Sequence, residues 1–325
     1  MEIIEVRNLS KVYKTFRRKE GIIAAFLSLF NRKYVTKKAV SNVNFDIHKG
    51  EVVGFIGPNG AGKSTVIKMM TGILVPTSGT VKALGFVPFE EREKYVKHIG
   101  VVFGQKTQLW WDIPPIDAFY LLRDIYDVPE KQFKERLNYM IKILKLKKIV
   151  ETPVRNLSLG ERMRCELIAA LLHNPEIVFL DEPTIGLDIV AKEHIRAFIK
   201  HINQKYKTTF IVTTHDMDDI EELCKRVIVI DYGKIIYDGL LETLRKRYLK
   251  NKIINIVLAK PYTKKFVMNG AKVSKIDEYN ISIKVDLDKQ NVSNIIGKLL
   301  HSHNVVDLCI DEIGIKEVIK KIYGG

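Results

Sequence analysis

The amino-acid sequence predicts an α/β fold built on a mostly parallel sheet, because short apolar runs alternate with amphipathic helical patterns along the chain. Three runs end in polar residues and are too short, and too rich in β-branched or aromatic residues, for helices: Val52–Ile56, Ile177–Leu180 and Phe210–Thr213. Such apolar strands suit a sheet covered on both faces, which binds ligands at the carboxyl ends of its strands. We therefore expect the functional residues there.

Length and composition indicate a globular protein with one large and one smaller domain. The chain has 325 residues, of which 46% are hydrophobic and 28% are charged, which argues against a disordered, collagen-like or disulfide-scaffold protein. Cys165, Cys224 and Cys309 are too few and too scattered for a disulfide framework or a CxxC metal site. This cysteine usage favours a reducing compartment.

Net charge is the unusual feature of the composition. Lys and Arg number 53 against 38 Asp and Glu, which gives +15 and indicates an anionic partner such as nucleic acid, a membrane surface or a nucleotide. The first residues are acidic where a secretion signal is basic, so we expect a cytosolic protein. The apolar stretch at 21–30 has about half of the roughly 20 residues that cross a bilayer, so no membrane span is expected.

The order of patterns along the chain predicts two domains. Within the first, Pro129 opens a helix that is expected to run to Val150 in an inserted helical subdomain at about 106–175. After about Leu244 the pattern predicts a strand at 281–287, a helix at 292–300, a strand at 305–308 and a helix at 315–322. We place an α/β domain at 1–245 and a small α+β domain at 246–325.

A glycine-rich loop follows the first predicted strand and precedes a helix that ends at Gly72. Its sequence, GPNGAGKS, fits the phosphate-loop pattern, in which backbone N–H groups surround phosphates. Lys63 would add charge at the β- and γ-phosphates, and the Ser64 hydroxyl would ligate Mg²⁺. The residues predicted to contact the nucleotide here are Gly57, Pro58, Asn59, Gly60, Ala61, Gly62, Lys63, Ser64 and Thr65. The alternative is a glycine-rich turn without a ligand.

Two adjacent carboxylates, Asp181 and Glu182, end the second predicted strand. Asp181 is predicted to hold the Mg²⁺ shell and Glu182 to polarise a water for in-line attack on the γ-phosphate, since positioning and electrostatics dominate phosphoryl transfer. The alternative is a helix N-cap followed by Pro183 at the first helical position.

Two further polar side chains are expected at the same sheet edge. His215 follows the third predicted strand, and Gln105 follows the apolar run Val101–Phe103. Gln105 would reach Mg²⁺ or the attacking water, and both residues are candidates for the catalytic site. Taken alone, a histidine in a loop is more often solvated or hydrogen-bonded to the backbone.

A serine-capped helix is predicted to begin after Ser158, because Glu161 at its third position completes a capping-box pattern. That structural role suffices by itself. The free N–H groups and the dipole of such an N-terminus also favour an anion, so this segment is a second candidate phosphate site.

Over about residues 1–245 these segments together resemble the nucleotide-binding subunits of ABC transporters, which are P-loop NTPases of the ABC ATPase type. All motifs occur in the family's order. The resemblance implies the signature motif at Ser158–Glu161, the Q-loop at Gln105, the Walker B pair at Asp181 and Glu182, the D-loop at Gly186–Asp188 and the switch histidine at His215.

The resemblance also implies ligands and a partner. ATP and Mg²⁺ are the expected cofactors, and two subunits are expected to dimerise head to tail, so that Ser158 and Gly160 of one copy face the γ-phosphate held by Lys63 of the other. Tyr13 stands where the family has an aromatic that stacks on adenine; the alternative is an ordinary strand tyrosine.

The chain departs from the family pattern at Leu159, where a second glycine is usual, and at Glu161, where glutamine is usual. Leu159 is expected to crowd the partner's nucleotide, and Glu161 adds negative charge near a phosphate. We therefore expect slow hydrolysis until the dimer is fully closed.

An insertion at about 14–38 replaces a short turn of the family. It carries eight Lys and Arg residues against Glu20, a net charge of +7, around the apolar stretch 21–30. A short apolar segment with basic flanks suits contact with an anionic membrane surface or a membrane subunit. The alternative is a solvated hairpin that folds its apolar part onto the domain.

Both tryptophans of the chain, Trp110 and Trp111, follow Gln105 closely. The resemblance implies a groove here for the coupling helix of a permease, and tryptophan is a common anchor at interfaces; packing within the domain is the alternative. The chain looks closest to ATPases of ABC-2 type exporters, whose permease is a separate chain.

The expected function is therefore the ATP-hydrolysing subunit of an exporter, held by its permease at the cytoplasmic face of the membrane. The alternative is a soluble ABC ATPase that acts on ribosomes or nucleic acid. The chain has one cassette, and too few residues separate Gly62 from Arg155 for a long coiled coil, so nucleic acid is the less favoured partner. A nucleotide sensor without turnover is disfavoured by Glu182.

Overall fold

The computed structural model describes residues 1–16, 34–104, 106–214, 216–248, 251–263, 269–287 and 289–312. The chain divides into two compact units, Met1–Gly239 and Leu240–Gly325. The boundary predicted from the sequence, after residue 245, lies a few residues later than this one.

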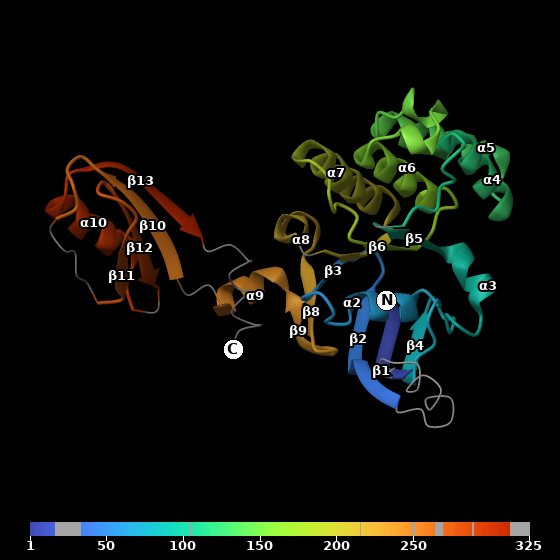
Figure 1. The fold of residues 1–325 in the computed structure, drawn as a ribbon, viewed down its shortest axis with the longest axis horizontal. Coiled ribbons are helices and arrows are strands. Elements are labelled where there is room, and N and C mark those ends of the chain that lie inside the picture. Colours follow the sequence, from blue (N-terminus) through green and yellow to red (C-terminus); the bar gives the residue numbers. More distant parts are fainter. Residues whose placement is uncertain are drawn as a thin grey trace, which may run out of the picture. The chain divides into compact units, whose positions relative to one another are not determined.

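A six-stranded sheet lies at the centre of the first unit (Figure 1). Its order is β5 (Ile99–Phe103), β6 (Ile177–Asp181), β7 (Thr209–Thr213), β3 (Val52–Ile56), β8 (Arg226–Asp231) and β9 (Lys234–Leu240). Its first five strands pair in parallel. The three strands predicted from apolar runs are β3, β6 and β7, which are neighbours in this sheet. Thr213 pairs with both Phe55 and Asp181, so the carboxyl ends of these strands share one edge.

A smaller antiparallel sheet has the order β2 (Tyr34–His48), β1 (Glu2–Phe16) and β4 (Ser78–Ala83). The pairing of β1 with β2 extends to Phe16 and Tyr34, so both ends of the predicted insertion at 14–38 are strand. The apolar stretch at 21–30 lies outside the described residues, and its membrane contact stays a prediction.

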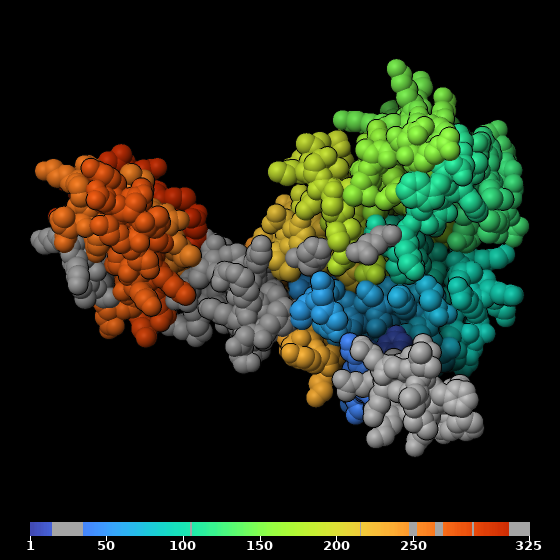
Figure 2. Space-filling model, viewed as in Figure 1, coloured from blue at the N-terminus to red at the C-terminus, as the bar shows by residue number. Residues whose placement is uncertain are grey.

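Helices surround the larger sheet and also form the inserted subdomain, whose side chains gather in one lobe of the first unit, drawn in green in Figure 2. Among the described residues of this unit, the α-helices are α2 (Lys63–Met70), α3 (Arg92–Tyr95), α4 (Pro115–Ile125), α5 (Glu130–Ile143), α6 (Leu159–Leu171), α7 (Ile189–Tyr206) and α8 (Met217–Leu223). Short 3₁₀ helices are η1 (Val96–His98), η2 (Ile149–Glu151) and η3 (Val154–Asn156).

Helix α5 ends at Ile143, earlier than the predicted end at Val150. Lys145 adopts a left-handed conformation with φ of 55°, which cannot continue a helix. The apolar spacing continues past this point because Leu146 and Val150 remain buried in the subdomain core.

The main core lies between the two sheets and is completed by α2. The apolar face of α2 buries Val66, Ile67, Met69 and Met70, and each such side chain contributes about 1.5–3 kcal/mol. Phe45 of β2 packs edge-on against Phe55 of β3 with ring centroids 5.3 Å apart. This core fixes the start of α2 directly above the strand ends.

The second unit contains α9 (Leu241–Tyr248), β10 (Asn251–Leu258), β11 (Ala271–Lys275), β12 (Asn280–Asp286), α10 (Val292–Ser302) and β13 (Val305–Glu312). Its antiparallel sheet has the order β11-β12-β10-β13 and shares an apolar core with α10. β12, α10 and β13 match predicted elements, whereas the predicted helix at 315–322 lies outside the described residues. None of the helices in the described ranges is long and apolar enough to span a membrane.

Candidate nucleotide-binding site

The glycine-rich loop connects β3 to α2 in a conformation that excludes most side chains. Gly62 has φ of 113°, and a Cβ atom there would approach the Ala39 carbonyl oxygen to 2.6 Å. Lys63 begins α2 and is only 6% exposed. Its Nζ atom donates hydrogen bonds to the carbonyl oxygens of Gly57 at 2.6 Å and of Pro58 at 3.2 Å. The loop therefore folds around a cation.

Burial lowers the pKa of Lys63, while the carboxylates of Glu182 and Asp181 oppose that shift. The ammonium charge of Lys63 is held by two carbonyl oxygens of the loop. A buried ammonium with such weak partners is suited to bind an anion.

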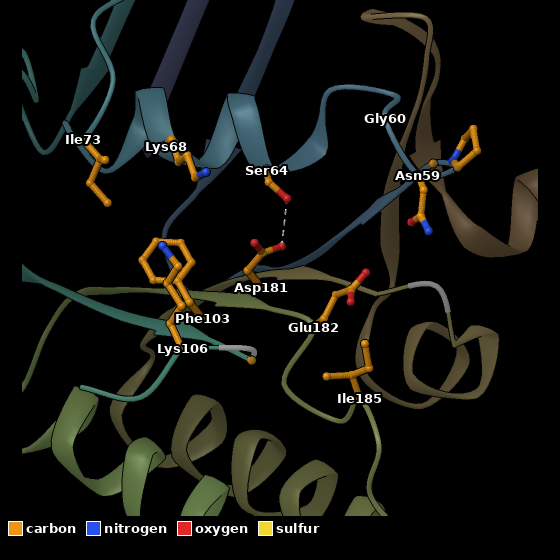
Figure 3. A pocket seen from close by; sticks show the side chains of 13 residues that line it. Asn59, Gly60, Ser64, Lys68, Ile73, Phe103, Lys106, Asp181, Glu182 and Ile185 are labelled. Atoms are coloured by element: carbon orange, nitrogen blue, oxygen red, sulfur yellow. Dashed lines mark hydrogen bonds between the residues drawn. The ribbon is translucent and has the colours of Figure 1, made fainter. Parts of the chain in front are cut away.

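Asp181 lies at the end of β6 and meets the start of α2. Its Oδ1 atom accepts hydrogen bonds from the Ser64 hydroxyl at 3.4 Å and from the Thr213 hydroxyl. Figure 3 shows the Ser64 and Asp181 side chains pointing toward one another across the cavity. A hydroxyl and a carboxylate at one point are oxygen ligands of the kind that Mg²⁺ prefers. Sequence reasoning missed Thr213, because nothing in its pattern distinguishes it from other strand threonines.

Glu182 has a left-handed backbone with φ of 56°, a conformation that is uncommon outside glycine and clusters at functional sites. Its N–H donates to the Thr213 carbonyl at 2.9 Å. A Cβ atom at Gly104 would approach the Glu182 carbonyl oxygen to 2.3 Å, so only glycine fits there. This backbone turn directs Glu182 toward the side of the phosphate loop (Figure 3).

The phosphate loop, Ser64 and the two carboxylates Asp181 and Glu182 line one cavity of about 1020 Å³. Its lining comprises Gly57, Pro58, Asn59, Gly60, Ser64, Lys68, Ile73, Phe103, Gly104, Lys106, Asp181, Glu182 and Ile185. Lys68 and Lys106 add two cations that sequence reasoning missed. Lys68 stands one helical turn after Ser64, so its spacing was a usable signal.

Tyr13 lines an adjoining cavity of about 240 Å³ together with Lys63, Ser64 and Thr65. It comes from β1 and pairs with Lys37 of β2, which lines the same cavity. The antiparallel sheet thus brings an aromatic ring beside the phosphate loop, although the sequence separates them widely.

The predicted capping box at the start of α6 is confirmed. The Glu161 N–H donates to the Ser158 hydroxyl oxygen at 3.3 Å, and a Glu161 carboxylate oxygen accepts from the Ser158 N–H at 2.9 Å and its hydroxyl at 2.8 Å. The Ser158 backbone and hydroxyl lower the pKa of Glu161. The added negative charge is therefore directed at Ser158.

Ser158 and Gly160 line neither of the two cavities. Leu159 instead reaches Gly186 of the same chain, where a Cβ atom would lie 3.1 Å from its Cδ2. Gly160 faces Ala191 at the start of α7 in the same way. One copy of the chain thus brings the phosphate loop to Asp181 and Glu182, but it does not bring the predicted signature residues to them.

Gln105 and His215 lie outside the described residues, and their predicted roles stay predictions.

Beside His215 in the chain, Thr214 donates its hydroxyl hydrogen to Asp219, which is fully buried and also accepts from Thr184 and Arg196. Burial raises the pKa of Asp219. Sequence reasoning missed this network, because burial of one acidic residue in the acidic helix α8 leaves no mark in the sequence.

Comparisons with known proteins agree with this geometry. A family model described as ABC transporter matches residues 40–185. The ABC transporter ATP-binding protein NatA of Bacillus subtilis (strain 168) is 34% identical over 66% of this chain and 87% of its own length. The linearmycin resistance ATP-binding protein LnrL of the same organism is 28% identical over 90% of this chain and 96% of its own length. A solved dimer of an ATP-binding cassette in a post-hydrolysis state, bound to ADP and Pi, has a TM-score of 0.60 at 26% identity, over 73% of this chain and 98% of its own.

Proposed function

Because this chain belongs to the ABC transporter ATP-binding proteins, which bind ATP with Mg²⁺ and hydrolyse it, we propose that it drives an exporter whose permease is a separate chain. The observation that carries the proposal is one cavity lined by the phosphate loop on one side and by Asp181 and Glu182 on the other. That arrangement supports a phosphate-binding surface opposite Asp181 as a metal ligand and Glu182 as a general base, the parts that phosphoryl transfer requires.

Ser64 and Asp181 fit a Mg²⁺ ion that arrives with ATP. Magnesium in nucleotide sites takes few protein oxygens and completes its shell with phosphates and water, and these two side chains already meet at 3.4 Å. When bound, Mg²⁺ supplies positive charge that offsets the phosphate charge. Gln105 is proposed as a further ligand on the strength of the family motif.

The chain's own side chains divide the remaining work. Lys63 exchanges the carbonyl oxygens of Gly57 and Pro58 for phosphate oxygens. Glu182, held by its left-handed backbone, orients the attacking water and accepts its proton. His215 is proposed to stabilise the transferred phosphoryl group, and Tyr13 to stack on adenine beside Thr65.

A head-to-tail dimer completes the site in this proposal. Ser158 and Gly160 line neither cavity of their own chain, and in this proposal a second copy or a close paralogue supplies them. Ile189 and Val190, which follow the D-loop, are 73% and 60% exposed, and such exposed apolar residues suit an interface. The dimeric solved relative supports this geometry.

The permease is proposed to dock on the inserted subdomain. Trp110 and Trp111 are 46% and 51% exposed, which favours an interface over the alternative of packing. Tyr120, Leu121 and Ile125 of α4 are also exposed. The protein would then be peripheral at the cytoplasmic face of the membrane, with the basic insertion at 14–38 as a second contact. Likeness to LnrL, a linearmycin resistance protein, over most of the chain supports export.

Purification from membranes in mild detergent tests this proposal. A polytopic membrane chain is expected to co-purify, and replacing both Trp110 and Trp111 by Ala is expected to abolish its recovery. Tyr279→Ala, an exposed aromatic of the second unit, is the matched control and is expected to keep the partner. Co-sedimentation with ribosomes instead of a membrane chain would favour the soluble alternative.

A further inference from the structure

Glu166 is a buried carboxylate on α6 that the proposed function does not use. It is 4% exposed. It accepts hydrogen bonds from the Thr107 hydroxyl and from the Gln108 N–H at 3.1 Å, and the Gln108 side-chain amide donates to its backbone carbonyl at 3.2 Å. Burial raises the pKa of Glu166, while the donors from Thr107 and Gln108 oppose that shift. Burying a carboxylate is costly unless hydrogen bonds compensate it, and the donors of Thr107 and Gln108 supply that compensation.

The donors belong to the tryptophan loop, which we define as residues 107–113. The same loop has further links to the segment around Ser158. The Arg155 N–H donates to the Trp111 carbonyl at 3.0 Å, and the Val154 N–H donates to the Ile113 carbonyl at 3.2 Å. The Arg162 guanidinium lies 5.4 Å from the centre of the Trp111 ring. All of these partners lie in η3 or α6.

We propose that Glu166 is a positioning residue that locks the tryptophan loop to α6, so that Trp111 and Ser158 move as one body. The inference rests on the proposed function, which gives Ser158 and Trp111 their roles. A displacement of the loop by a permease then reaches α6, and with it Ser158, through the hydrogen bonds of Glu166 and through the backbone hydrogen bonds of Val154 and Arg155. Because Thr107 follows Gln105 by two residues, the same lock sets the position of the chain next to the proposed Q-loop.

A carboxylate suits this role better than its amide. Its Oε1 atom accepts from both the Thr107 hydroxyl and the Gln108 N–H, the latter at 3.1 Å, and its Oε2 atom accepts from the same N–H at 3.3 Å, whereas an amide turns one of these acceptors into a donor. Glu166→Gln therefore keeps the shape of the side chain. In either orientation of the new amide, one of its N–H groups faces the Gln108 N–H instead of an acceptor. Thr107→Val removes the hydroxyl from the other side of the lock and also leaves the shape unchanged.

Steady-state kinetics of the isolated full-length chain test the lock. Glu166→Gln and Thr107→Val are expected to keep the affinity for ATP within about twofold, because neither residue lines the cavities, while kcat falls about tenfold from misplacement of the signature segment. The double variant is expected to be no slower than Glu166→Gln alone, because both changes open one contact. Glu193→Gln, an exposed residue of α7, is the control.

Hydrogen exchange gives the structural readout of the same variants. Backbone amides of 107–109 are expected to exchange faster, while those in the middle of α6 keep the wild-type rate. Folded variants with wild-type kcat and exchange would overturn the proposal, as would a loss of ATP affinity that matches the loss of kcat. If Glu166→Gln does not fold, Thr107→Val decides.

The two proposals fail separately, because these measurements need no permease. If Glu166→Gln and Thr107→Val lose kcat tenfold but no membrane chain co-purifies with the protein, the positioning role of Glu166 stands and the exporter proposal falls. If a permease co-purifies but Glu166→Gln and Thr107→Val keep the wild-type kcat, the exporter proposal stands and the positioning role of Glu166 falls.

Discussion

The sheet edge and the inserted subdomain hold their functional groups by different means. At the sheet edge, backbone carbonyls hold Lys63 and a left-handed backbone turns Glu182. In the subdomain, side-chain carboxylates do this work, since Glu161 binds Ser158 and Glu166 binds the tryptophan loop. The geometry of the edge is therefore part of the fold, whereas the geometry of the subdomain depends on contacts that one substitution removes.

The largest effect is expected at the edge, from Glu182→Gln. The backbone that positions residue 182 is unchanged, so ATP binding and thermal stability are expected to stay, while kcat falls about 10²–10⁴-fold as a general base is lost. ATP titration and phosphate release measure the two effects. Retained turnover would remove Glu182 as the base.

Asp219 provides a test of the contrast between backbone and side-chain support. It belongs to the sheet edge, but there a side chain, the Asp219 carboxylate, holds Thr214, which precedes His215. Asp219→Ala leaves Arg196 and two threonine hydroxyls without their shared acceptor. We expect a loss of about 3 kcal/mol in the free energy of unfolding, as for other broken buried pairs, measured by urea denaturation. The exposed neighbour Asp218→Ala is expected to change it by no more than about 0.5 kcal/mol. Equal effects of the two substitutions would contradict a structural role for the network.

His173 tests the attachment of the subdomain to β5. Its ring stacks on Tyr126 at 3.9 Å, its Nε2–H donates to the Ile99 carbonyl at 2.9 Å, and burial lowers its pKa to about 4. The unfolded chain has a histidine pKa of about 6.5 and binds the proton first, so stability falls as pH drops from about 6.5 to about 4.

The expected contribution of His173 is up to about 3 kcal/mol over this range. Urea denaturation at several pH values measures it, and His173→Gln is expected to show a shallower slope. Identical slopes for variant and wild type would show that His173 does not titrate as proposed.

The smallest effects are expected at the signature departures. Glu161→Gln frees Ser158 from a charged partner, and Leu159→Gly removes the contact with Gly186. The carboxylate of Glu161 offsets about 0.3–1 kcal/mol of the attraction between the helix N-terminus and a phosphate. ATPase rates of Glu161→Gln at saturating ATP are therefore expected to rise about two- to fivefold, and Leu159→Gly is expected to change the rate in the same direction. Rates no faster than wild type would contradict the prediction that Leu159 and Glu161 slow hydrolysis.

Sequence reasoning succeeded where local patterns decide the structure. Apolar runs specified β3, β6 and β7, and the spacing of Ser158 and Glu161 specified a cap. It missed what only packing decides. The left-handed Lys145 ends α5 early, and burial of Glu166 and Asp219 depends on chain segments far away in the sequence. The roles of Gln105 and His215 remain predictions.

The placement of Trp110 and Trp111 side by side has a practical consequence. They are the two tryptophans of the whole chain, so the tryptophan fluorescence of the unlabelled protein, excited selectively over tyrosine, reports on one loop and not on an average over the fold. Their partial exposure leaves the emission sensitive to whatever covers them. The protein thus carries its own optical probe in the loop on which the permease is proposed to dock.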